Sequence, residues 1–157
     1  SPGVFRCYDT TRLTQRIKEE KERSDFVVVI VHWGKELYHT LESVQPETGK
    51  LYIDSGADMV IGHHAHVLQG VEFYKGKLIA YNLGNFIFND QAVDTGILKW
   101  ELTNDGKSKF YFYPGIQSNC YTKEVVGNEA ISLYNKMTSW SINASLLEDG
   151  LIIEKSE

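Results

Sequence analysis

The chain has 157 residues, of which 42% are hydrophobic, 24% charged and 12% aromatic, and its formal net charge is −5. A chain of this length can bury about two thirds of the surface that its unfolded form exposes, so folding requires neither a metal nor a disulfide framework. The acidic balance, with 16 Lys plus Arg spread along the sequence, argues against nucleic acid as a partner, and no apolar run is long enough for a transmembrane helix.

The first part of the sequence predicts helices and buried strands in alternation. Residues 9–23 combine N-cap side chains with a narrow apolar stripe, which is typical of a helix. Residues 26–31 are apolar and mostly β-branched, which predicts a strand covered on both faces. A short helix over about 46–55 and a second buried strand over 58–61 follow. This order predicts an α/β fold with parallel strands and a functional site at their carboxyl ends.

The second part of the sequence predicts antiparallel strands and one helix. Residues 71–82 and 97–113 each contain two strand-like runs, separated by Lys-Gly-Lys in the first segment and by Asn-Asp-Gly in the second. Both segments therefore predict β-hairpins. Apolar residues at helical spacing predict a helix over 128–140, and residues 146–153 predict a small terminal hairpin.

Four of the five histidines lie at the ends of the two predicted buried strands. His32 follows the first strand, and His63, His64 and His66 follow the second. Residues two apart in an extended chain share a face, so His64 and His66 can converge while His63 points elsewhere. Neighbouring parallel strands lie about 4.8 Å apart, which allows His32 to approach the pair. Such imidazoles bind a metal, act as general acid or base, or hydrogen-bond within the fold, and we favour metal binding.

Four motifs between residues 25 and 88 carry a family resemblance. They are His-Trp-Gly-Lys-Glu at 32–36, Ile-Asp-Ser-Gly-Ala-Asp at 53–58, Gly-His-His-Ala-His-Val-Leu-Gln-Gly at 62–70 and Asn-Leu-Gly-Asn-Phe at 82–86. With these motifs the chain closely resembles bacterial capsule-synthesis proteins of the CapA (poly-γ-glutamate) type, in the calcineurin-like metallophosphatase superfamily. The resemblance implies part of a four-layer α/β/β/α sandwich built around a two-metal site.

The resemblance also implies metal ligands and a cofactor. His32 and His64 match ligands of one ion and His66 matches a ligand of the other, whereas His63 stands where many relatives have glycine and is the weakest candidate. The implied cofactor is a divalent ion, Mn, Fe or Zn, with two ions in the parent site and at most one held by this chain.

Part of the superfamily's ligand set is absent from the sequence. It contains no Asp-x-His, Gly-Asp or Gly-Asn-His motif, and so lacks the bridging carboxylate of a two-metal site. The sequence also begins with Ser1 and shows no signal segment. We therefore expect residues 1–157 to be the C-terminal portion of one domain, with the remaining ligands in a missing N-terminal half, and to be inactive alone.

Three other side chains near the histidines are candidates for the site. Glu36 can orient an imidazole or act as a general acid, or it can be a solvated loop carboxylate. Asn82 and Asn85 follow a predicted strand and either bind substrate or shape the turn, and we favour the turn. His66 and Glu36 are the candidate catalytic residues.

The resemblance implies a metal-dependent phosphoesterase in capsule biosynthesis, on the outer face of the cell envelope, with a phosphoester or anionic polymer as substrate. It leaves open a membrane anchor in the parent chain. The alternative is a non-catalytic metal-binding or scaffold module in polymer synthesis or export. A third hypothesis is a self-contained one-zinc hydrolase that uses Glu36. Cys7 and Cys120 are too few for a disulfide framework, and their pairing stays open.

Overall fold

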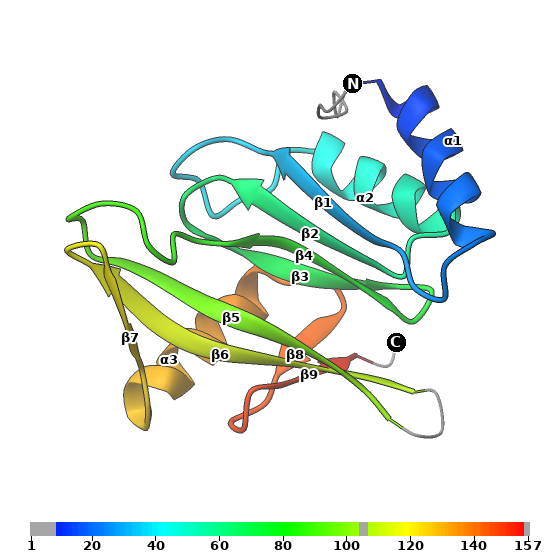
Figure 1. Cartoon of the computed structure of the whole chain (residues 1–157). Coiled ribbons are helices and arrows are strands. Elements are labelled where there is room, and N and C mark those ends of the chain that lie inside the picture. The colour runs from blue at the N-terminus through cyan, green and yellow to red at the C-terminus, as the bar shows by residue number, and fades with distance from the viewer. Residues whose placement is uncertain (1–8, 104–106, 156–157) are drawn as a thin grey trace.

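The computed structural model describes residues 9–103 and 107–155 and contains two β-sheets and three helices in this part of the chain. The sheets have the strand orders β1-β2-β4-β3 and β5-β6-β9-β8, with β7 paired to β6 (Figure 1). The elements are α1 (Thr10–Lys21), β1 (Val28–Trp33), α2 (Val44–Asp54), β2 (Met59–His64), β3 (Leu68–Tyr74), β4 (Lys77–Leu83), β5 (Val93–Leu102), β6 (Ser108–Ser118), β7 (Tyr121–Glu124), α3 (Asn128–Trp140), β8 (Ala144–Leu146) and β9 (Leu151–Glu154). The mixed α/β class is as predicted.

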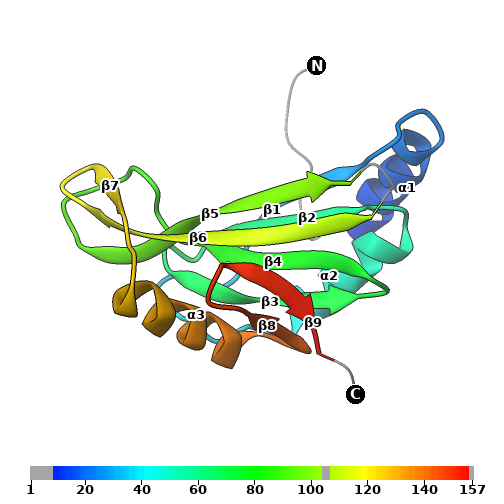
Figure 2. The same cartoon turned by 90° about the horizontal axis from the view of Figure 1, so that it is seen from below.

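Two apolar clusters hold these elements together. One lies between the first sheet and the helices α1 and α2, which cover the face of that sheet turned away from the second sheet (Figure 1). The other lies between the two sheets and includes the buried side of α3, which packs along β3 and β8 (Figure 2). The first sheet is therefore covered by helices on one face and by the second sheet on most of the other.

The strand β1 departs from the prediction because only one of its faces is buried. Val29 and Val31 point into the cluster beneath the helices, whereas Val28 is 40% exposed and Ile30 is 71% exposed. The prediction of a strand covered on both faces is thus wrong for β1. In the described part of the chain β1 pairs only with β2, and the core between the sheets takes residues from β2, β3 and β4 but none from β1. An apolar run indicates strand propensity, but position in the sheet decides coverage.

Most other predicted elements form close to their expected bounds, whereas β5 and β6 are longer than predicted, since β5 begins at Val93 rather than at 97 and β6 ends at Ser118 rather than at 113. Helix α1 begins after Asp9, whose side chain caps the backbone N–H of Arg12, and α3 occupies the predicted range. Both predicted hairpins form, as β3–β4 and β5–β6, and β8–β9 forms the terminal hairpin. The turn at 104–106 lies outside the described residues. Strand β7 was not predicted.

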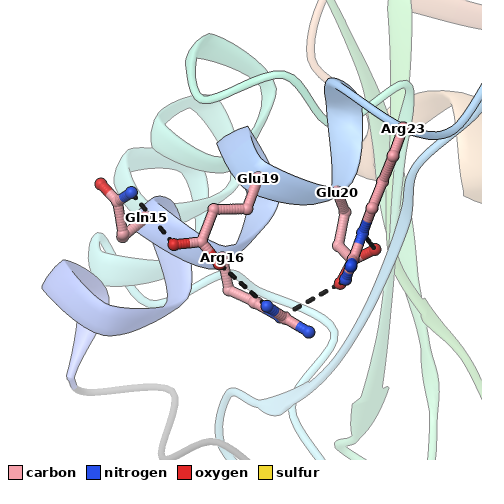
Figure 3. Close-up of polar contacts among 5 residues, drawn as sticks. All are labelled: Gln15, Arg16, Glu19, Glu20 and Arg23. Atoms are coloured by element: carbon pink, nitrogen blue, oxygen red, sulfur yellow. Dashed lines mark hydrogen bonds and ion pairs between the residues drawn. The ribbon is translucent and has the colours of Figure 1, made fainter.

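The exposed face of α1 carries a network of charged side chains (Figure 3). Arg16 pairs with Glu19 and Glu20 at 2.9 and 3.0 Å, and Arg23 makes two hydrogen bonds to Glu20. Gln15 donates to Glu19 at 3.2 Å. Because these groups are largely in contact with water, the network contributes little to stability.

The carboxylate of Asp58 ties α1 and the start of β1 to β2. It accepts a hydrogen bond from the backbone N–H of Val27 at 2.8 Å and pairs with Lys21 at 2.8 Å and Lys77 at 3.2 Å. Burial by itself raises the pKa of this carboxyl, but the hydrogen bonds from Lys21, Val27 and Lys77 outweigh it, so the pKa lies below its ordinary value.

Replacing Asp58 with asparagine is expected to lower the free energy of unfolding by about 1–2 kcal/mol near neutral pH, since a neutral amide cannot pair with the two lysines. Because the pKa is lower in the folded state, the stabilisation is present above the unfolded-state pKa and is lost as pH falls through the folded-state pKa. Urea denaturation of both proteins at about pH 7 and about pH 3 checks this. The difference between the unfolding free energies of the wild type and Asp58→Asn should be smaller at the lower pH. An equal difference at both pH values would contradict the electrostatic origin of the stabilisation.

Candidate metal centre

The histidines gather at the carboxyl ends of β1 and β2. The two strands are parallel, and their register sets His32 opposite His63. The ring centroids of His32 and His64 lie 4.4 Å apart, and those of His64 and His66 lie 6.2 Å apart. The strand spacing thus brings His32 next to His64, whereas His66 comes from the turn that follows β2 and from neither strand.

The turn that carries His64 and His66 has an unusual backbone. His64 has φ 106° and His66 has φ 62°, in the region that residues other than glycine rarely adopt. The turn is fixed by Ala65, which is fully buried and whose carbonyl accepts a hydrogen bond from the N–H of Leu37 at 2.8 Å. Strain of this kind persists where the surrounding structure enforces it, and it is frequent at functional sites.

Three side chains in the described part of the chain form a group able to hold one metal ion. Glu36, His64 and His66 each offer a ligand atom, and these atoms lie within 4.8 Å of one another. The Glu36 carboxylate oxygen lies 4.0 Å from Nε2 of His64, and the two side chains are 59% and 29% exposed. Two imidazoles and a carboxylate are a known ligand set for zinc with an open position, so these residues fit one divalent ion.

The other two candidate histidines lie outside this three-residue group. His32 contacts the ring of His64 but is not among the grouped ligands. The pKa of His63 lies below its ordinary value, mainly because the His63 ring is partly buried and to a smaller extent because of the charge of His32. The assignment of His32 and His64 to one ion and of His66 to another therefore differs from the grouping of His64 with His66 in this structure.

The two candidate asparagines have different surroundings. Asn82 is 1% exposed, and its side-chain oxygen accepts the N–H of Gly84 at 3.0 Å, while its Nδ2 has no partner in the described part of the chain. Asn85 instead contacts the group of Glu36, His64 and His66, since its Oδ1 lies 2.8 Å from Nδ1 of His66. The geometry therefore places Asn82 in the turn and Asn85 against a candidate ligand.

Comparison with known proteins shows the family to which this chain belongs. Residues 2–90 match the family model described as "Bacterial capsule synthesis protein PGA_cap". The chain belongs to the PGA_cap family. The matched range contains all seven candidate site residues and ends before β5, so the candidate site lies in the family part of the chain.

Relatives of this PGA_cap chain are named as PGA, capsule or polyglutamine synthesis proteins. It is 35% identical over 117 residues to the PGA biosynthesis protein CapA of Bacillus subtilis (strain 168), an alignment that covers 73% of the chain and 30% of the relative. It is 38% identical over 90 residues to the capsule biosynthesis protein CapA of Bacillus anthracis, with 55% and 22% covered. A probable polyglutamine synthesis accessory protein of Mycobacterium tuberculosis is 28% identical over 98 residues, with 59% and 26% covered. The chain thus spans less than a third of these relatives.

Two buried glutamines position the Glu36 loop of this PGA_cap chain, and the sequence reasoning missed both. Gln69 donates to the carbonyl of Tyr38 at 2.9 Å and accepts from Gln45 at 2.9 Å, and both glutamines are fully buried. The Gln45 side chain also fills the space beside Gly34, where an added Cβ would approach it to 2.9 Å. A signal was available only for Gln69, a polar residue within an apolar strand, because buried amides usually hydrogen-bond to other polar groups of the protein.

Proposed function

We propose that this PGA_cap chain carries the histidine-bearing part of a metal-dependent phosphoesterase site, in a cell-envelope protein of capsule or poly-γ-glutamate synthesis. The names of the relatives support the capsule-related role. The observation that carries the phosphoesterase proposal is the convergence of Glu36, His64 and His66 at the carboxyl ends of parallel strands. In the complete domain we propose the four-layer sandwich expected from the sequence, with the site facing the outside of the cell.

His64 and His66 would hold a Mn, Fe or Zn ion together with Glu36. When bound, such an ion polarises a phosphoryl oxygen and lowers the pKa of a water molecule. His32 lies on the exposed face of β1 beside His64 and, in its protonated form, can donate a proton to the leaving oxygen when the P–O bond of a phosphoester breaks.

The remaining ligands are proposed to come from other parts of the full-length protein. A two-metal site needs a bridging carboxylate, whereas the ligand group of the described residues contains one carboxylate, Glu36. The outer edge of β1 has no partner strand in the described residues, and its exposed face presents Val28 and Ile30 next to His32. This edge is therefore where an additional segment would bring further ligands to the histidines.

No helix in the described residues is long and apolar enough to cross a membrane. The association with the cell envelope is accordingly proposed from the capsule relatives alone.

The proposal is tested by hydrolysis of bis(p-nitrophenyl) phosphate in the presence of Mn²⁺, with the full-length protein and with this chain alone. The full-length protein should turn over the substrate, and the isolated chain should remain at background because it lacks the Asp-x-His, Gly-Asp and Gly-Asn-His ligand motifs. His64→Ala or His66→Ala in the full-length protein should lower kcat by at least about 100-fold, since each removes a metal ligand.

A matched surface control is Gln15→Ala on α1, which loses only a contact with Glu19 and should retain full turnover. Turnover that survives both histidine substitutions would contradict the site. Metal binding by the full-length protein without turnover of any phosphoester would instead favour the scaffold alternative.

A further inference from the structure

The loop that follows β4 holds the ring of His66 from two directions. Oδ1 of Asn85 lies 2.8 Å from Nδ1 of His66, and the ring centroid of Phe88 lies 4.7 Å from that of His66. Asn85 is partly buried, so water competes only in part for this hydrogen bond. A single loop thus holds the His66 imidazole both at Nδ1, through Asn85, and on one face of the ring, through Phe88.

The hydrogen bond determines which nitrogen of His66 carries the proton. With Oδ1 of Asn85 facing the ring, as in this structure, the hydrogen bond requires a hydrogen on Nδ1 of His66, because an amide oxygen accepts and cannot donate. In the neutral ring Nε2 then keeps its lone pair, which is the form that binds a metal. Metal-binding histidines are commonly held in this way, with the second ring nitrogen donating to an oxygen of the protein.

The loop itself is anchored at both ends. At its start, Gly84 has φ +72° and an added Cβ would meet the carbonyl of Asp94 at 2.8 Å, so the chain runs close against β5. At its far end, the fully buried Gln117 of β6 donates to the carbonyl oxygens of Asn89 and Gln91 at 2.8 and 3.0 Å. The second sheet therefore fixes the loop from which Asn85 reaches His66.

We propose that Asn85 is a positioning residue for the candidate metal centre, which holds His66 in the tautomer that leaves the lone pair of Nε2 free to bind a metal ion. The turn itself is stabilised by Asn82, whose side chain accepts the N–H of Gly84, and the side-chain hydrogen bond of Asn85 within the described residues goes to His66. The effect on metal affinity rests on the proposed function, whereas the tautomer is a property of the metal-free chain.

The test uses three variants of this chain: Asn85→Ala removes the acceptor, Asn85→Asp keeps one, and Asn89→Ala is the control. Asn89 lies in the same loop, and within residues 9–103 and 107–155 its side chain accepts only the N–H of Gln91. The tautomer of His66 is read from ¹⁵N chemical shifts of the imidazole in metal-free protein. Zinc affinity is read by competition with a chromophoric chelator.

In the wild-type chain and in Asn85→Asp, His66 should carry its proton on Nδ1. Asn85→Ala should give a mixture of tautomers and a zinc affinity lower by about 10- to 100-fold. Asn89→Ala should match the wild type in both measurements. If the alanine variant fails to fold, the aspartate variant decides, because loss of the Nδ1–H form in Asn85→Asp would overturn the proposal.

Two other results would also overturn it: an unchanged His66 tautomer in Asn85→Ala, or an equal loss of zinc affinity in Asn89→Ala, which would assign the effect to the loop as a whole. Absence of phosphoester turnover in the full-length protein would contradict the proposed function but not the tautomer, since that is measured without metal.

Discussion

Replacing either His64 or His66 with alanine is expected to lower the affinity of this chain for a single Zn²⁺ or Mn²⁺ ion by at least about 100-fold. Each substitution removes one of the two imidazoles in a group of three donors, and loss of a direct ligand should exceed the about 10- to 100-fold cost of losing a residue that only orients one. Elemental analysis after dialysis against a limiting concentration of each metal measures the retained ion.

The matched control is His63→Ala, because His63 lies beside the group without belonging to it, and this variant should retain metal as the wild type does. His32→Ala separates two hypotheses for the ligand set. Metal loss equal to that of His64→Ala would support the pairing of His32 with His64, and near-normal retention would support the group that includes Glu36. Equal metal content in the wild type, His64→Ala and His66→Ala would remove the basis for the metal centre.

The sequence predicted most elements whose signals are local. The capping side chain of Asp9 precedes α1, and the turn at Lys75 and Gly76 separates β3 from β4, so a few adjacent residues contain the information. The one-sided burial of β1 is different, because the exposure of Ile30 depends on which strands the second sheet covers. Strand β7, with four residues and three of them exposed, has little apolar alternation to reveal it.

The residues of the candidate site were named from the sequence, but the structure brings them together in a different way from the one expected. Convergence of His64 and His66 was expected from two residues in one extended strand. In the structure β2 ends at His64, and His66 lies beyond it in a turn with positive φ at both histidines. The place of Glu36 depends on Gln45 and Gln69, which are distant from it in sequence. Such pairings are set by the assembled fold, so spacing along one strand cannot reveal them.

Gly62 is a second position where a small change should have a large effect, this time on stability. It lies in β2 between β1 and β4, and a Cβ added there would lie 2.1 Å from both Nε1 of Trp33 and the carbonyl oxygen of Tyr81. These two groups form a buried hydrogen bond of 3.1 Å. Gly62→Ala must break this bond or separate the strands, so we expect the free energy of unfolding to fall by about 3 kcal/mol. Urea denaturation followed by circular dichroism measures it.

Gly49→Ala in α2 is the matched control for this prediction. A Cβ there would lie 3.2 Å from Cδ1 and Cγ2 of Ile79 and 3.3 Å from the ring of Trp33, which requires shifts of only a few tenths of an ångström, and alanine gains about 1 kcal/mol in helix propensity over glycine. Its unfolding free energy should therefore stay within about 1 kcal/mol of the wild type. Because Gly62 directly precedes His63 and His64, displacement of β2 should also weaken zinc binding in Gly62→Ala but not in Gly49→Ala. A Gly62→Ala chain as stable as the wild type would contradict this prediction, because it would show that Trp33 and β4 can move aside without a loss of stability.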